Sequence, residues 1–290
     1  MKTRQFARVA LCLFLLLPAP AIARPALWVV KDADTTIYLF GTVHLLPNDT
    51  TWRYPALDKA LSDSRTLYIE LTDDDQANMA GLVLSYGLDG EHPLSGMLDQ
   101  AELQQLKTAA TQAGVPGGMQ TLDMMRPWLA ALTLATAPLL KAGLDPQHGV
   151  DKQLKAQMLA AGKQVLGLET AEQQIRFLAD MPEPTQLAFL RSALKDIDKS
   201  PAVLTQLIDA WKNGNVQQIA RIEDEDMRQQ SPALYQHLLV QRNRTWAAKI
   251  GDLLHRQPGT IFIAVGAAHL AGPDSVQVQL NKLGIPAERE

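Results

Sequence analysis

The chain has 290 residues, 47% of them hydrophobic, which is enough for a sizeable core and argues against a disordered protein. Lysine and arginine number 27 against 31 aspartate and glutamate, a net charge of −4 with histidine neutral. A surface of this sign argues against nonspecific binding to nucleic acid.

Residues 1–23 have the pattern of a secretory signal peptide. Lys2, Arg4 and Arg8 precede an apolar run from 9 to 17, and small residues then lead to an A-x-A ending at Ala23. We expect cleavage after Ala23 and a periplasmic or secreted mature chain. A membrane anchor is the alternative, but the run is short for a bilayer and the small-residue ending favours cleavage.

Cleavage would also change the charge and the available chemistry. It removes three basic and no acidic residues, leaving 24 basic against 31 acidic residues and a net charge of −7. The single cysteine, Cys12, lies in the removed segment. The mature chain would therefore have no disulfide and no thiol nucleophile, and any metal site would be built from His, Asp and Glu.

The first part of the mature chain predicts three strands and a helix. Residues 28–40 form two extended pieces around a polar turn at 31–34, and residues 54–62 have a helical pattern. Residues 66–71 are branched and aromatic enough for a buried strand, with Glu70 near its C-terminal end.

The middle of the chain predicts mainly helices. Asp99 and Glu102 have the spacing of a capping box that opens a helix ending near Gly114, and residues 126–140 resemble a buried helix. A fourth strand is expected at 164–168, directly before Glu169.

The last third predicts helices followed by one more strand. Thr170 and Gln173 form a second capping box, and a long helix is expected from Ser231 as N-cap to about residue 256. A buried strand at 261–265 and a closing helix at 273–283 complete the pattern. We expect one α/β domain, 24–290, with a mixed central sheet, flanking helices and helical insertions at about 73–161 and 171–256.

The same short turn follows the second strand and the last buried strand. Gly41-Thr42-Val43-His44 comes after the first of these, and Gly266-Ala267-Ala268-His269 comes after the second. A single G-x-x-H turn is weak evidence for a ligand site, because a histidine at a strand end is more often structural than a ligand. The repeated context leads us to expect that the two histidines meet in one site.

Four predicted strands end in residues able to bind a ligand, namely His44, Glu70, Glu169 and His269. In open α/β sheets the carboxyl ends of the strands are where loops converge and ligands bind. Two imidazoles and one or two carboxylates suit Mn, Co, Fe or Zn, and such a metal lowers the pKa of a bound water. Glu169 also has a simpler interpretation, because a carboxylate before a helix complements the helix dipole.

Three further residues are candidates to support this site. Asp151 begins a probable helix, where it either faces the site or caps the helix. On the long helix, Arg242 and Trp246 are one turn apart, so that Arg242 either binds a carboxylate or oxyanion under Trp246 or packs over Trp246 at the surface. Asn243 lies next to Arg242. No serine elbow, H-E-x-x-H, P-loop or G-x-G-x-x-G is present, which leaves metal-activated water or a His/Glu acid–base pair.

Taken in order, these motifs resemble the TraB/GumN family, which contains the Tiki metalloproteases and is similar in fold to the erythromycin-esterase and ChaN-like proteins. The resemblance rests on Gly41–His44, Glu70, Gly149–Asp151, Gly167–Thr170, Arg242, Asn243, Trp246 and Gly266–Leu270. It implies an α/β core with inserted helices. From the Tiki branch it implies a divalent-metal peptidase whose ligands and base come from His44, Glu70 and His269.

The resulting hypothesis is a periplasmic metal-dependent hydrolase, peptidase-like, acting on a peptide or small molecule. His44 and His269 would hold Mn, Co or Zn, Glu70 would be the third ligand or general base, and Arg242 would steady the oxyanion. The alternative is a periplasmic binding protein that captures a metal complex, a haem-like ligand or a peptide signal without turnover. Neither hypothesis involves nucleic acid or a stable membrane anchor after cleavage.

Overall fold

Six strands form one mixed sheet in the computed structural model, which describes residues 24–197 and 199–290. The strands are β1 (Leu27–Lys31), β2 (Thr35–Thr42), β3 (Thr66–Ile69), β4 (Gln164–Gly167), β5 (Gly259–Gly266) and β6 (Glu288–Arg289). Their order across the sheet is β4-β3-β5-β2-β1-β6. This confirms the α/β class and the mixed sheet. The expected signal peptide lies outside the described residues.

Four of the strands run parallel, which decides where the motifs lie. β4, β3, β5 and β2 pair in parallel, whereas β1 is antiparallel to both of its neighbours. β2 and β5 stand far apart in the sequence but are adjacent in the sheet, with Thr42 in register with Gly266. Both G-x-x-H turns therefore leave the same edge of the sheet, side by side.

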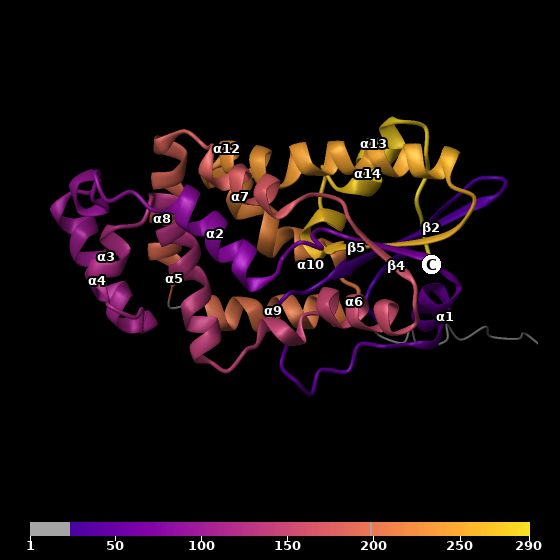
Figure 1. Cartoon of the computed structure of the whole chain (residues 1–290), viewed down its shortest axis with the longest axis horizontal. Helices are drawn as coiled ribbons and strands as arrows, with labels where there is room; N and C mark the ends of the chain where they lie inside the picture. Colours follow the sequence, from indigo (N-terminus) through magenta and orange to yellow (C-terminus); the bar gives the residue numbers. More distant parts are fainter. Residues whose placement is uncertain (1–23, 198) are drawn as a thin grey trace, which may run out of the picture.

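The two faces of the sheet carry different apolar side chains, as the two-residue period of a strand requires. Phe40 and Phe262 point to one face, where they pack with residues of four helices, α1 (Pro55–Asp63), α6 (Val150–Ala160), α9 (Ser200–Lys212) and α10 (Val216–Ala220). Ile37 and Ile263 point to the other face, where they pack with residues of α13 (Gln241–Arg256) and α14 (Val276–Lys282). Figure 1 shows the result, a sheet between α13 and α14 on one side and α1, α6 and α9 on the other.

The α-helices lie mainly in the parts of the chain where the sequence predicts them. The α-helices are α1 (Pro55–Asp63), α2 (Gln76–Gly87), α3 (Gln100–Ala113), α4 (Met119–Asp123), α5 (Pro127–Lys141), α6 (Val150–Ala160), α7 (Ala171–Ala179), α8 (Glu183–Asp196), α9 (Ser200–Lys212), α10 (Val216–Ala220), α11 (Asp226–Gln230), α12 (Pro232–Tyr235), α13 (Gln241–Arg256) and α14 (Val276–Lys282). Short 3-10 turns are η1 (Leu94–Met97), η2 (Pro146–His148) and η5 (Ala267–Leu270). No helix in the described part of the chain is long and apolar enough to cross a membrane.

Both predicted capping boxes form. The Asp99 carboxylate accepts from the Glu102 amide at the start of α3, and Thr170 caps α7 in the same way through Gln173. α3 ends at Gly114, whose φ of 71° is the left-handed conformation that favours glycine. In Figure 1, α2, α3, α4, α5 and α8 gather beyond one end of the sheet. They enclose apolar clusters of their own.

The long helix expected from Ser231 differs from the prediction. Ser231 precedes α12, but its side chain makes no capping hydrogen bond. Between α12 and α13 lies a π-helical turn, η4 (Gln236–Val240), and a second π-helical turn, η3 (Arg221–Glu225), precedes α11. Such turns insert an extra residue into a helix and are frequent at functional sites. Both line a pocket at the carboxyl ends of the parallel strands.

Candidate functional site

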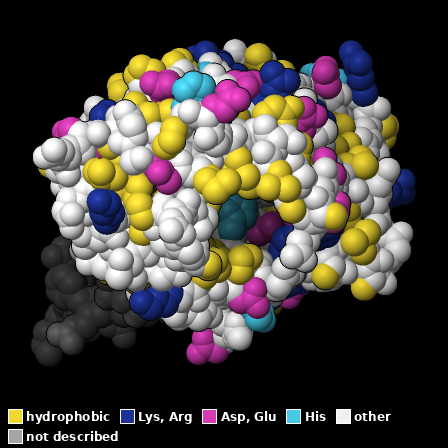
Figure 2. Space-filling view, turned by 60° about the vertical axis from the view of Figure 1, so that its left-hand side comes forward, with side chains coloured by type: hydrophobic (Ala, Val, Ile, Leu, Met, Phe, Trp, Pro, Cys, Tyr) yellow, Lys and Arg dark blue, Asp and Glu magenta, His cyan; other side chains and the backbone are white. Residues whose placement is uncertain are grey.

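A pocket of about 410 Å³, the main pocket of the site, opens at the carboxyl ends of the parallel strands. Its walls are largely apolar, and the polar residues within it are Thr42, His44, Glu70, Gln174, Glu223, Arg242 and His269. Figure 2 shows a hollow in the surface that has histidine and acidic side chains deep inside it and hydrophobic side chains around its rim. A smaller cavity of about 180 Å³ adjoins it and shares Thr42, His44, Glu70 and Gln174.

His44 is held in position by Asp151. Its Nδ1 lies 3.1 Å from Asp151 Oδ1, in the first turn of α6. α6 begins close beside the His44 turn because Gly149 has no side chain, and a Cβ there would lie 2.6 Å from the His44 carbonyl oxygen. The His44 side chain is 58% exposed, so its other ring nitrogen, Nε2, opens on the pocket.

The surroundings of His44 favour its protonated form. Partial loss of contact with water at the pocket wall would by itself lower the pKa of His44, but the hydrogen bond to Asp151 and the charges of Glu70 and Asp151 outweigh this effect and raise the pKa to about 9.

Glu70 is anchored through both carboxylate oxygens. The Gly266 backbone N–H donates to Oε1 at 2.7 Å, and Arg242 Nη2 and Gln174 Nε2 donate to Oε2 at 2.5 and 3.1 Å. Burial opposes ionisation, but chiefly the positive charge of Arg242 holds the pKa of Glu70 far below its usual range. Glu70 is therefore a fixed anion at the carboxyl end of β3.

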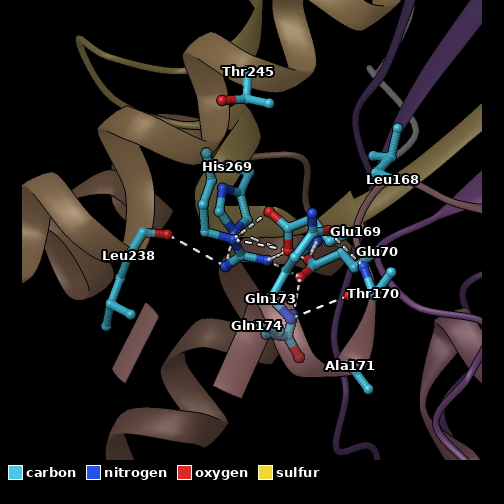
Figure 3. Close-up of polar contacts among 12 residues, drawn as sticks. Glu70, Leu168, Glu169, Thr170, Ala171, Gln173, Gln174, Leu238, Thr245 and His269 are labelled. Carbon is cyan, nitrogen blue, oxygen red and sulfur yellow. Dashed lines mark hydrogen bonds and ion pairs between the residues drawn. The ribbon is translucent and has the colours of Figure 1, made fainter. Parts of the chain in front are cut away.

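Arg242 lies at the centre of the buried network. Its Nε and Nη2 donate to Glu169 at 3.0 and 2.9 Å, and Nη1 donates to the Leu238 carbonyl and to His269 Nε2 at 3.3 and 3.1 Å. With the bond to Glu70, these contacts use all five N–H donors of the guanidinium. Figure 3 shows Glu70, Glu169 and His269 close together, with dashed lines marking the polar contacts between the residues drawn. The guanidinium carbon also lies 4.7 Å from the centre of the Trp246 ring.

Arg242 and Glu169 lie together in the buried part of the site. Arg242 is buried, contacts two carboxylates and lies over the Trp246 ring. The Glu169 side chain pairs with Arg242. No N–H of Arg242 is left to reach an oxyanion, so the expected oxyanion role does not fit this arrangement, and a positioning role does.

His269 is neutral, and both of its ring nitrogens are hydrogen-bonded to neighbouring side chains. Its Nδ1–H donates to Asn243 Oδ1 at 2.6 Å, and its Nε2 accepts from Arg242 at 3.1 Å. Burial and the positive charge of Arg242 lower the pKa of His269 to about 3. Asn243 itself is tied to the Asp274 carbonyl at 2.9 Å, which fixes the ring that it holds.

Gly266 is the point at which the predicted residues meet. A Cβ added there would lie 3.2 Å from Glu70 Oε1, 3.5 Å from His44 Nε2 and 3.6 Å from His269 Cδ2. The structure thus brings His44, Glu70 and His269 together around the glycine of the second G-x-x-H turn. Asp151, Arg242 and Asn243 contact members of this group directly, and the Glu169 side chain is joined to it through Arg242.

Three polar residues of the pocket were not identified from the sequence. Gln174 follows the Thr170 capping box by one residue and gave no signal beyond the start of α7. Glu223 lies in an acidic run, 223–226, of the kind that usually covers a solvated helix face. In the fold it lines the pocket, and burial raises its pKa. Thr42 lies inside the first G-x-x-H turn, and nothing in the sequence around it indicates a role in the site.

The comparisons with known proteins match most of the chain. The model of the TraB/PrgY/gumN family matches residues 26–289. The uncharacterised protein YbaP of Escherichia coli (strain K12) is 26% identical over 263 residues, covering 88% of this chain and 92% of its own length. An uncharacterised protein of Treponema pallidum (strain Nichols) is 23% identical over 301 residues, covering 92% of this chain and 88% of its own.

No solved structure gives a significant match to the chain. The family match covers the sheet, the inserted helices and every residue of the site described above. The chain therefore belongs to the TraB/PrgY/gumN family.

Proposed function

We propose that this protein is a hydrolase of peptide-like or other acyl substrates, with His44 as its general base. The observation that carries the proposal is the state of the His44 ring. Nδ1 is held by Asp151, while Nε2 opens on the main pocket beside Glu70. A base oriented by a carboxylate and open to a cavity is the arrangement that general base catalysis requires.

The reaction follows from these contacts. Neutral His44 accepts a proton at Nε2 from a water molecule, and the water oxygen forms a bond to the carbonyl carbon of the substrate. The proton then passes from Nε2 to the departing amine nitrogen or alkoxide oxygen as its bond to that carbon breaks. Asp151 keeps the Nδ1 proton in place and stabilises the imidazolium that forms between these steps.

The remaining polar residues hold this geometry. Arg242 fixes Glu70 and the neutral His269 through Nη2 and Nη1, and the mostly apolar walls of the pocket exclude bulk water. Glu70, ionised and immobile, stabilises positive charge on His44 as the proton is transferred. A site so connected loses its geometry when one member is removed.

A divalent metal, Mn, Co or Zn, is a separate proposal that rests on the resemblance to the Tiki branch. In the arrangement seen, the residues do not fit it. His269 Nε2 and Glu70 Oε2 face Arg242, and no three His, Cys, Asp or Glu side chains of the described residues are placed as a metal-binding group. A metal on these atoms would require both contacts with Arg242 to break.

Metal analysis separates the two proposals. Wild-type protein and the His44→Ala and His269→Ala variants would be dialysed against Mn, Co or Zn, and the bound metal would be measured. Lower content in both variants would support a metal at these histidines. Equal content in all three proteins would contradict it and leave the role of His44 as base intact.

The His44→Ala variant tests the hydrolase itself. We expect residues 24–290 to cleave members of a mixed peptide and ester library, with kcat/KM about 10²–10⁴-fold lower in the variant. His92→Ala is the matched control, because His92 also bonds an aspartate through Nδ1 and is 68% exposed, but lies outside the main pocket. Cleavage that persists in His44→Ala would contradict the proposal, as would ligand capture without cleavage.

We also propose that the protein acts in the periplasm. The basic residues, apolar run and A-x-A ending of residues 1–23 support that location.

A further inference from the structure

The hydroxyl of Thr42 is buried without a protein partner. Thr42 is 2% exposed, and its Oγ1 makes no hydrogen bond to any described residue. A buried hydroxyl is normally paired, because its loss of contact with water is otherwise uncompensated. A group that stays unpaired at the edge of a pocket is therefore one that a small molecule from the pocket can satisfy.

Thr42 lies between the two cavities of the site. It lines both the main pocket and the smaller one, as do His44 and Glu70. Its register partner in β5 is Gly266, so the two residues project to the same face of the sheet. On that face, Glu70 Oε1 and His44 Nε2 are 3.2 and 3.5 Å from the position that a Gly266 Cβ would take.

The two cavities differ in size and chemistry. The main pocket, about 410 Å³, has leucines and a methionine in its walls, contributed by α9, α11 and η4. These are suited to an apolar side chain or acyl group. The smaller cavity, about 180 Å³, is lined by Asp74, Asp151 and Glu70. Carboxylate oxygens accept hydrogen bonds, so these walls suit water.

We infer that Thr42 binds the attacking water, which enters from the smaller cavity while the apolar part of the substrate occupies the main pocket. The inference rests on the proposed hydrolase function. One O–H of the water donates to His44 Nε2 and the other to Thr42 Oγ1, which leaves the lone pairs of its oxygen directed at the substrate. The proton that leaves the water goes to His44 Nε2, as in the reaction described above.

Kinetics of Thr42 variants test this role. Thr42→Val keeps the shape of the side chain and removes the hydroxyl, so we expect kcat to fall about 100-fold with little change in KM. Thr42→Ser restores the hydroxyl and should recover most of the rate. A kcat of Thr42→Val equal to wild type, in a protein whose activity is lost in His44→Ala, would overturn the inference and leave the hydrolase proposal standing.

Thr35→Val is the matched control, because Thr35 lies at the other end of β2 and is also 2% exposed. Its Oγ1, unlike that of Thr42, has protein partners in Asp34 Oδ1 and Gln257 O, both at 3.3 Å. We expect Thr35→Val to lower the melting temperature without changing kcat, and Thr42→Val to lower kcat without lowering the melting temperature. The reverse pattern would mean that the Thr42 hydroxyl is structural.

Crystal structures at high resolution give a test that needs no substrate. The wild type and Thr42→Ser should hold an ordered water within hydrogen-bond distance, about 3 Å, of both the hydroxyl and His44 Nε2. Thr42→Val should lose it. A wild-type structure without that water, or a water that keeps its place in Thr42→Val, would overturn the inference independently of any activity measurement.

Discussion

His44 and His269 occupy equivalent turns but have opposite protonation. Each follows a buried parallel strand and a glycine, yet the pKa of His44 is raised to about 9 and that of His269 is lowered to about 3. His44 faces the carboxylates of Asp151 and Glu70, whereas His269 is buried against the guanidinium of Arg242. Partners from other parts of the chain therefore decide what each histidine can do.

Gly266→Ala tests how closely the groups around this glycine are packed. The backbone tolerates alanine, with φ of −48°, but the new Cβ would lie 3.2 Å from Glu70 Oε1 and crowd His44. We expect kcat/KM to fall about 10-fold or more because the reacting groups shift. Gly81→Ala, in α2 with no atom near the added Cβ, is the control and should leave activity unchanged. Equal kcat/KM in both variants would contradict the convergence on Gly266.

The pH dependence of kcat/KM tests His44 as the base. A base must be unprotonated, so kcat/KM should rise with pH through a midpoint near pH 9, the pKa of His44 in the free protein, and level off above it. Asp151→Asn removes a charge that favours protonation and should move the midpoint about 1–3 units lower. A profile whose midpoint stays in place in Asp151→Asn would mean that another group titrates.

The sequence predicts the members of the site better than their partners. His44, Glu70 and His269 were found because each follows a strand with a strong apolar pattern. The pairing of Arg242 with both Glu70 and Glu169, and the presence of Glu223 in the pocket, depend on helices that approach the sheet from distant parts of the chain. No local spacing encodes such an approach.

At the scale of elements, α13 is joined to the sheet edge through buried charge. One turn of α13 presents Arg242, Asn243 and Trp246 to the site, and Arg242 bonds the residues that end β3 and β4. The π-helical turn η4 directly precedes this segment and supplies the Leu238 carbonyl to Arg242. The same helix therefore covers one apolar face of the sheet and supplies the buried Arg242 to the site.

Arg242→Met tests the contribution of this buried cation. Its loss would leave two buried carboxylates without their partner, and we expect the free energy of unfolding at pH 7 to fall by about 3–5 kcal/mol in urea titrations. Arg191→Met is the control, because Arg191 pairs with Glu102 at 2.6 Å but is 49% exposed. That variant should cost less than about 1 kcal/mol. Similar losses in the two variants would contradict a special role for the Arg242 network.

Strands, caps and most helices could be predicted because each has a local pattern. The apolar runs predicted β2, β3, β4 and β5, and the Asp99 and Thr170 boxes placed the starts of α3 and α7. The π-helical turns could not be predicted, because one extra residue hardly changes the apolar pattern of a helix. β6 was not predicted, because its two residues, Glu288 and Arg289, are exposed and form strand pairs only with β1.

At the scale of the whole molecule, strand order creates the site. The sequence places the two G-x-x-H turns at opposite ends of the mature chain, and only the parallel pairing of β2 with β5 makes them neighbours. β3 lies on the other side of β5, which brings Glu70 to the same edge. Convergence of the strand ends was expected from the general behaviour of α/β sheets, but this order was not predicted, because the choice of strand partners has no local signal.

The central claim is that His44 activates water for attack on an acyl carbon. The most direct measurement is mass spectrometry of the products formed from a peptide library in water enriched in oxygen-18, with residues 24–290 and the His44→Ala variant. Wild-type protein should yield new carboxylates that each carry one heavy oxygen, and His44→Ala should not. Intact peptides with the wild-type protein, or labelled products at the same rate in His44→Ala, would contradict the claim.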